Sequence, residues 1–321
     1  MLPASLALAA LAVALAWPVP LALARAAWPA RAPAVALIVW QAIALAGGLS
    51  MIGSLLVFGL TPFGEDLVRG LASLLQHLLN GTLPEGATLP HTFALSGAVL
   101  LAVHLVLNLM LAAVRASRSR SRHRQLLALL SRPDPEHPGA RLLDEAAPVA
   151  YCLPGATRSV TVLSDGLLEI LDAEELAAVI AHEEAHARQR HHLLLLAFGA
   201  WRRSLPWFPI ATRALDAVAV LVEMLADDRA RRQASEAVLA RSIARVALGL
   251  DGVAGRPRPG ADVAENLPET LGASEPAALR RIERLVSAAE PLGVMGRVTA
   301  LAASAALLLV PTALLLAPAL A

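Results

Sequence analysis

The sequence predicts a mainly α-helical membrane protein, with four transmembrane helices and an α+β domain between the third and the fourth. Hydrophobic residues make up 57% of its 321 residues and charged residues only 17%, and the mean hydropathy is +0.60. This composition excludes an ordinary water-soluble domain and makes the lipid bilayer the first expected partner. Four apolar segments are long enough to cross a bilayer: residues 2–24, 35–60, 93–114 and 298–321.

The first apolar segment ends in Ala-Leu-Ala-Arg25, which is similar to a signal-peptide cleavage site. It lacks the basic region that precedes the apolar part of a signal peptide, and its apolar stretch is long. We therefore expect it to be retained as a transmembrane helix.

The orientation in the membrane follows from the arginines. One group comes directly after the third span, a second lies between the first two spans, and Arg297 precedes the fourth span. The members of the first two groups are Arg115, Arg118, Arg120, Arg122 and Arg124, and Arg25 and Arg31. Because basic residues stay in the cytoplasm, residues 116–296 are expected to be cytoplasmic and both termini external. This position explains the arginine run without direct nucleic-acid binding.

All 27 basic residues are arginine, which together with the many alanines and leucines indicates a GC-rich bacterial genome. The expected location is therefore a bacterial plasma membrane, with a multi-pass topology. The chain divides into three transmembrane helices (1–115), a basic, proline-rich cytoplasmic connector (116–147), a cytoplasmic domain (148–296) and the fourth transmembrane helix (297–321).

The cytoplasmic domain is expected to begin with two adjacent strands, 149–153 and 159–163, separated by Pro154-Gly155. The sequence Ser164-Asp165-Gly166 then turns the chain into a helix. A strand directly before that helix is well placed to pair with an extended substrate, and an ordinary packed strand fits the pattern equally well. Cys152, the single cysteine, is expected to be buried and structural.

Residues 182–186 read His-Glu-Glu-Ala-His, inside a helix that Asp172 and Glu175 are expected to cap. Histidines at positions i and i+4 project from one helix face and can bind a single metal ion. The intervening Glu183 then faces the open coordination position, as the general base of the HExxH zinc-peptidase motif does.

A third metal ligand must come from elsewhere in the chain, and Glu223 in a second apolar helix can supply it. Asp227, one helical turn later, can accept a hydrogen bond from a ligand histidine and fix its tautomer. The alternative is a chance match in an exposed helix of an alanine-rich protein. The helical, apolar context of both segments argues against it.

Two further polar features have several interpretations. Residues 193–222 are apolar but contain Arg202, Arg203, Pro206 and Pro209. Three arrangements are compatible with this pattern. One is a hairpin that enters the membrane, and another is two helices on the bilayer surface with Trp201 and Trp207 at the interface. The third is a core helix followed by a loop. His104 and Asn108 share one face of the third span, where we expect an interhelical hydrogen bond rather than a metal.

Four segments together resemble the peptidase unit of the BlaR/MecR-type membrane zinc metallopeptidases. They are Leu163-Ser-Asp-Gly-Leu-Leu168, Ala178-Val-Ile-Ala-His-Glu-Glu-Ala-His186, Leu221-Val-Glu-Met-Leu-Ala-Asp-Asp228 and Arg281-Ile-Glu-Arg-Leu285. That family consists of gluzincins and is related more distantly to the HtpX and CAAX-protease group. The resemblance covers roughly residues 150–290 by motif, and the four-span topology is also similar.

The resemblance implies a gluzincin domain in which His182, His186 and Glu223 bind zinc, Glu183 is the catalytic base and Asp227 supports a ligand. It implies a zinc metalloendopeptidase that acts in signal transduction, on a cytoplasmic transcriptional repressor or on itself. The sequence ends at Ala321 without the extracellular sensor domain of the β-lactam receptors, so β-lactam sensing is not expected.

No histidine follows His192, which leaves Arg229, Arg231 and Arg232 as candidates for stabilising the transition state. Two other functions stay open. One is an HtpX-like quality-control protease of the membrane, and the other is a signalling scaffold with a vestigial site.

Overall fold

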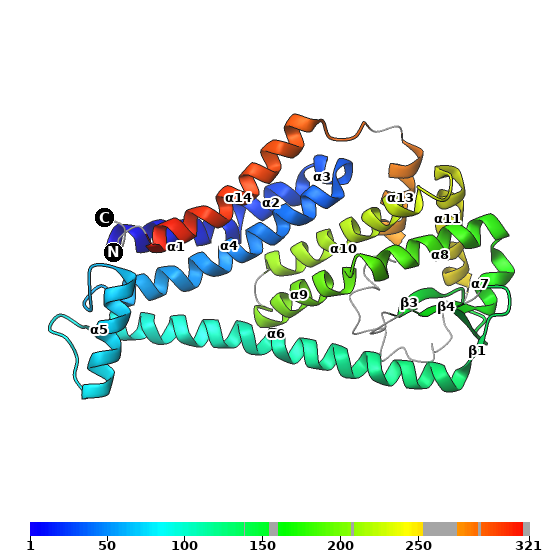
Figure 1. Ribbon diagram of the computed structural model, residues 1–321. Helices are drawn as coiled ribbons and strands as arrows, with labels where there is room; N and C mark the ends of the chain where they lie inside the picture. The colour runs from blue at the N-terminus through cyan, green and yellow to red at the C-terminus, as the bar shows by residue number, and fades with distance from the viewer. Residues whose placement is uncertain (138, 154–159, 207–208, 253–274, 288–289, 317–321) are drawn as a thin grey trace. The chain divides into compact units, whose positions relative to one another are not determined.

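The computed structural model describes residues 1–137, 139–153, 160–206, 209–252, 275–287 and 290–316. These residues are mostly helical, with one small sheet, as Figure 1 shows. The chain divides into two compact units. Unit 1 comprises Met1–Asn108, Pro206–Ile210 and Leu292–Ala321, and unit 2 comprises Leu109–Leu205 and Ala211–Pro291.

Unit 1 is built mainly from apolar helices, both long and short. They are α1 (Leu2–Ala16), α2 (Pro18–Arg25), α3 (Trp28–Arg31), α4 (Pro33–Gly59), the first part of α6 (Leu89–Leu130) and α14 (Val294–Leu316). Both α1 and α14 pack against α4. The helix breaks between α1 and α2 at Trp17, because Pro18 restricts the residue before it.

The four predicted spans are confirmed as helices long and apolar enough to cross a membrane. Their bounds are Leu2–Arg25, Pro33–Gly59, Leu89–Leu130 and Val294–Leu316. They indicate a multi-pass membrane protein. A shorter helix between the second and third spans, α5 (Leu67–Asn80), was not predicted. Asp66 caps its start, with a side chain that accepts from the Arg69 backbone N–H, and Gly81, with a left-handed φ of 64°, caps its end.

Helix α6 continues well past residue 114, the expected end of the third span. Its 42 residues extend for about 63 Å at 1.5 Å per residue, roughly twice the thickness of a bilayer core. The first half of the expected connector is therefore helix, because arginine, alanine and leucine favour a helix and the first proline stands only at Pro133.

Unit 2 contains a four-stranded sheet in the order β1-β2-β4-β3. The strands are β1 (Ser131–Pro133), β2 (Ala140–Leu143), β3 (Ala150–Leu153) and β4 (Val160–Ser164). The predicted strands correspond to β3 and β4, which are adjacent as expected and pair antiparallel, whereas β1 and β2 lie in the expected connector. Pro154-Gly155 falls outside the described residues.

Of the two interpretations of the strand before the helix, the ordinary packed strand is confirmed and the edge that receives a substrate is wrong. That strand is β4, which pairs with β2 on one side and β3 on the other. Its backbone groups are therefore used within the sheet. Among the described strands the edges belong to β1 and β3, and β3 also packs against α8 (Ala173–Arg188).

Within the described residues, six helices belong to unit 2 in addition to the second part of α6. They are α7 (Asp165–Ile170), α8, α9 (His191–Ser204), α10 (Pro209–Ala230), α11 (Glu236–Gly252) and α13 (Glu275–Val286). The turn at Ser164 opens the short α7, whose Leu167 N–H donates to the Ser164 hydroxyl. Gly166 is required there, because a Cβ would meet the Ala146 carbonyl oxygen at 2.0 Å.

Residues 193–222 fall largely into two helices, α9 and α10, so the interpretation as a core helix followed by a loop is wrong. Ala214, Leu215 and Val218 on α10 are fully buried. Trp207 lies outside the described residues. Neither helix is among the candidate spans, and the two membrane-associated interpretations stay predictions.

The remaining polar residues make local contacts. Asn108 donates to the backbone carbonyl of His104 at 2.8 Å, so this hydrogen bond runs within α6 rather than between helices. Cys152 on β3 is half-buried, with the Thr161 hydroxyl 4.0 Å from its sulfur.

Candidate metal centre

The helix that contains His-Glu-Glu-Ala-His is fixed at its start. The Glu175 N–H donates to the Asp172 carboxylate at 2.9 Å, and the Asp172 N–H donates to the Glu175 carboxylate at 3.2 Å, which is the predicted capping box. Glu175 is fully buried and forms ion pairs with Arg241 and Arg245 of α11. These contacts hold α8 in place, and His182 and His186 lie in its last two turns.

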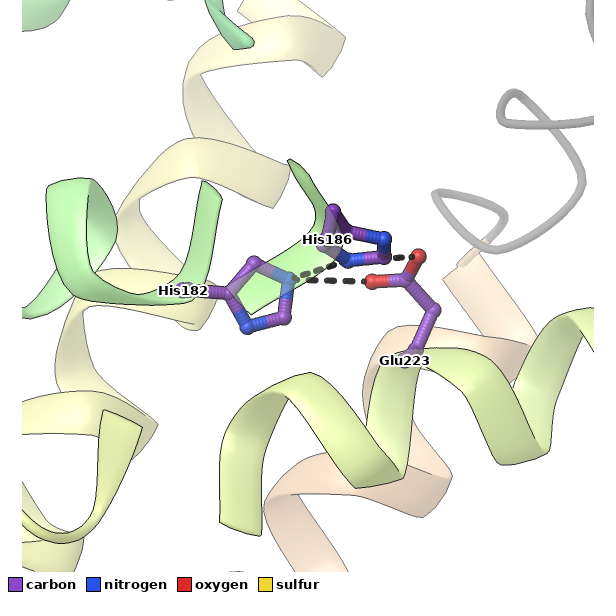
Figure 2. Close-up of side chains that lie close together, drawn as sticks. All are labelled: His182, His186 and Glu223. Carbon is purple, nitrogen blue, oxygen red and sulfur yellow. Dashed lines mark hydrogen bonds and ion pairs between the residues drawn. The ribbon is translucent and has the colours of Figure 1, made fainter. Parts of the chain in front are cut away.

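Figure 2 shows that His182, His186 and Glu223 converge on one point. The Nε2 atoms of the two histidines are 3.1 Å apart. One Glu223 oxygen lies 3.2 Å from His182 Nε2, and the other lies 3.4 Å from His186 Nε2. The sequence predicted these three residues as metal ligands, and α8 and α10 bring them together.

These separations suit one metal ion. Zinc bonds to nitrogen and carboxylate oxygen of about 2.0–2.1 Å in a tetrahedral arrangement put neighbouring ligand atoms about 3.3–3.4 Å apart. The three observed separations run from 3.1 to 3.4 Å. Two imidazoles and one carboxylate are also a donor set typical of catalytic zinc. The residues therefore fit a zinc ion.

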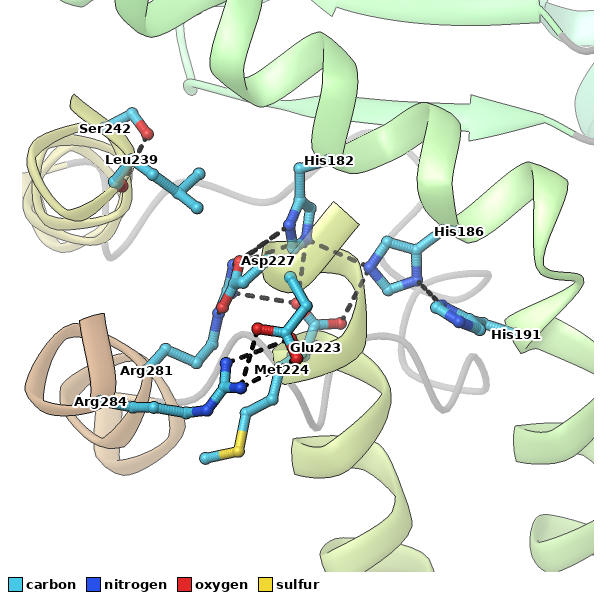
Figure 3. A network of polar contacts seen from close by, with 11 residues as sticks. His182, His186, His191, Glu223, Met224, Asp227, Leu239, Ser242, Arg281 and Arg284 are labelled. Carbon is cyan, nitrogen blue, oxygen red and sulfur yellow. Dashed lines mark hydrogen bonds and ion pairs between the residues drawn. The ribbon is translucent and has the colours of Figure 1, made fainter. Parts of the chain in front are cut away.

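Behind the ligands lies a buried network of charges, shown in Figure 3. Asp227 Oδ1 is 2.9 Å from His182 Nδ1, the ring nitrogen that faces away from the ligand cluster. Arg281 of α13 donates to both Asp227 oxygens, at 2.7 and 2.8 Å, and lies 3.0 Å from Glu223. One guanidinium thus pairs with both Glu223 and Asp227 of α10.

The network shifts the pKa values of its members. Burial raises the pKa of each carboxyl, but Arg281 and the histidines outweigh it; they lower the pKa of Asp227 to about 2 and that of Glu223 well below its usual value. Burial and the Arg281 charge lower the pKa of His182, but hydrogen bonds to Asp227 and Glu223 raise it to about 9. Both carboxylates are therefore ionised at neutral pH.

Glu183 follows His182 on α8 and is half-buried. The pKa of its carboxyl is raised, mainly by burial and also by the Glu223 charge. The charges of His182, His186 and Arg281 lower this pKa but do not outweigh the burial. A carboxyl group with a raised pKa, close to candidate metal ligands, is suited to taking up and releasing a proton.

Two further histidines follow the motif. His191, the first residue of α9, is 1% exposed, and its Nδ1 lies 3.2 Å from Nδ1 of His186. Burial and the charge of His186 lower the pKa of His191 to about 3, so the ring is neutral. His192 is half-buried and does not belong to the His-His-Glu group.

No role was predicted for Arg281, although it belongs to the Arg-Ile-Glu-Arg-Leu segment, one of those that resemble the family. Arg229, Arg231 and Arg232 were predicted instead as candidates for stabilising the transition state, and that role stays a prediction. Arg231 forms ion pairs with Asp228 and Glu236, whereas Arg281 pairs with Glu223 and Asp227. The Arg-Ile-Glu-Arg-Leu segment pointed to Arg281, but a short segment does not reveal which distant residues Arg281 contacts.

The comparisons agree with this geometry. Residues 113–219 match peptidase family M48. The match includes His182, Glu183 and His186 and ends before Glu223. It supports a membrane-type metallopeptidase, and enzymes of this family are typically zinc-dependent. No curated protein and no solved structure matches the chain.

Proposed function

We propose that this chain is a zinc-dependent endopeptidase, embedded in a bacterial plasma membrane, that cleaves protein substrates at the cytoplasmic face. The observation that carries the proposal is the cluster of His182, His186 and Glu223, with ligand atoms separated by 3.1–3.4 Å. The M48 match supports the class of enzyme, and the four candidate spans support the membrane location.

In this proposal His182, His186 and Glu223 hold the zinc ion. When bound, zinc supplies a Lewis acid that polarises a peptide carbonyl and lowers the pKa of water from 15.7 to about 7. The Glu183 carboxylate takes the proton from the attacking water and passes it to the leaving amine. Its raised pKa helps it to retain the proton between these two steps.

Asp227 and Arg281 prepare the ligands. Asp227 accepts a hydrogen bond from His182 Nδ1, which leaves Nε2 free to face the metal. Arg281 keeps Asp227 and Glu223 ionised and fixes their orientation.

Peptidase activity is tested with the purified full chain in detergent micelles and an unfolded protein substrate. The wild type should cleave it, a chelator should stop cleavage and added zinc should restore it. Glu183→Gln should retain zinc and lose cleavage, because only the base is removed. A Glu183→Gln protein as active as the wild type would refute the role of Glu183, and zinc-bound wild type without cleavage would support a scaffold with a vestigial site.

The cytoplasmic location is supported by the five arginines between Arg115 and Arg124, which directly follow the third span. A reporter fused after Arg124 should report the cytoplasm, and one at Glu85 the outside. A cytoplasmic signal at Glu85 would contradict the four-span topology.

We further propose that cleavage is regulatory and directed at a repressor-type cytoplasmic protein. Cross-linking with the inactive Glu183→Gln chain in cells distinguishes this role from quality control. Regulatory proteolysis predicts that one or a few folded substrates are trapped. A broad set of misfolded membrane proteins would instead support an HtpX-like quality-control role.

A further inference from the structure

The imidazole of His191 is buried and has specific partners on both ring nitrogens. His191 Nδ1 lies 3.2 Å from His186 Nδ1, and His191 Nε2 lies 2.9 Å from the side-chain oxygen of Gln189. The two rings meet edge to face, with centroids 4.8 Å apart and planes at 88° (Figure 3). The contact is on the side of His186 that faces away from His182 and Glu223.

The backbone between α8 and α9 places His191 in this position. Arg190 has φ 53°, a left-handed conformation that no other non-glycine residue shows among the described parts of the chain. For an L-residue this conformation costs about 1–2 kcal/mol. The sharp turn it makes brings the first residue of α9 back against the last turn of α8.

The proton positions follow from these partners. The Gln189 oxygen can only accept, so the proton of the neutral His191 ring lies on Nε2. His191 Nδ1 then has a lone pair and accepts the proton of His186 Nδ1. As a result His186 Nε2, the atom facing His182 and Glu223, has its lone pair free.

We propose that His191 is a positioning residue for the metal site, whose Nδ1 holds His186 in the tautomer and ring orientation that bind zinc. It acts on His186 as Asp227 acts on His182, so that each ligand histidine has its own buried acceptor. This inference rests on the proposed zinc site, and it adds to that site a residue outside the ligand set.

The test compares two substitutions of similar size in the full chain. In His191→Asn the side-chain oxygen replaces Nδ1 as the acceptor, whereas His191→Leu removes the acceptor. Zinc affinity, measured in competition with a chelator, should fall about 10–100-fold in His191→Leu. It should stay close to the wild-type value in His191→Asn and in the control His192→Leu.

The visible absorption of bound cobalt(II) shows which residues bind the metal, independently of the affinity. At saturation, His191→Leu should show the visible absorption of the wild type, because His182, His186 and Glu223 still bind the ion. Three outcomes would overturn the inference. They are wild-type zinc affinity in His191→Leu, an equal loss in His191→Asn and His191→Leu (a packing role), or an altered cobalt spectrum (His191 as a ligand).

The two proposals fail in different ways. A wild-type chain that binds zinc but cleaves no peptide bond refutes the proposed function, while the affinity comparison still decides the role of His191. A wild-type chain that binds no zinc overturns both.

Discussion

Replacing Arg281 with methionine removes a guanidinium that pairs with both Asp227 and Glu223. The arginine side chain is 9% exposed, and the two carboxylates are 1% and 12% exposed. Methionine keeps the apolar stem but leaves both negative charges buried without this partner. Removing one partner of a buried pair costs about 3–5 kcal/mol.

For a domain of 150–250 residues, one kcal/mol changes the unfolding midpoint by about 2–4 °C, so Arg281→Met should lower it by about 6–20 °C. The measurement is thermal unfolding of the zinc-free chain in detergent, followed by tryptophan fluorescence. Arg284→Met on the same helix is the matched control. Its partner Asp228 is 29% exposed, so we expect a loss of at most about 1 kcal/mol.

A second substitution tests the cause. If the loss comes from the unpaired Asp227 carboxylate, then adding Asp227→Asn to Arg281→Met should recover part of the stability, because the buried charge is gone. Equal midpoints for Arg281→Met and Arg284→Met would refute the reasoning. A further fall in the double variant would refute the electrostatic explanation.

Three more predictions follow from the same contacts. Asp227→Asn should weaken zinc binding about 10–100-fold, whereas Asp228→Asn should not, because Asp228 pairs with Arg284; equal sensitivity in a zinc titration would contradict this. Since the pKa of His182 is raised to about 9, its proton stabilises the zinc-free fold below pH 6.5 and is lost as the pH rises through 9. Zinc must displace that proton, so the affinity of the chain for zinc should increase from pH 7 to 9 and then level off. Calorimetry in two buffers of different ionisation enthalpy detects the released proton. Gly166→Ala should destabilise the chain by about 1–3 kcal/mol or more through its clash with the Ala146 carbonyl, while Gly48→Ala, which meets no atom within 4 Å, should leave the unfolding midpoint nearly unchanged.

The predictable part of the site depends on short-range geometry. His182 and His186 share a helix face because their spacing is four residues, and the capping residues Asp172 and Glu175 are local too. Glu223 and Asp227 are also four residues apart, so they share one face of the second helix. The M48 match supports the peptidase class that these residues indicate.

The missed features depend on contacts between distant residues. Arg281 is 99 positions from His182, and its approach depends on how α13 packs against α11 and α10, which no repeat in the sequence specifies. Strand β1 contains Pro133, which reads as a strand breaker; it is tolerated because β1 lies at an edge of the sheet. His191 was missed because its role depends on the left-handed turn at Arg190.

The central claim is that His182, His186 and Glu223 hold one zinc ion. Elemental analysis of the purified chain tests it most directly. We expect about one zinc per chain in the wild type and in Glu183→Gln, since three protein ligands and one open position complete a catalytic site. Glu223→Ala should lose most of the metal, and full zinc occupancy in that variant would contradict the account.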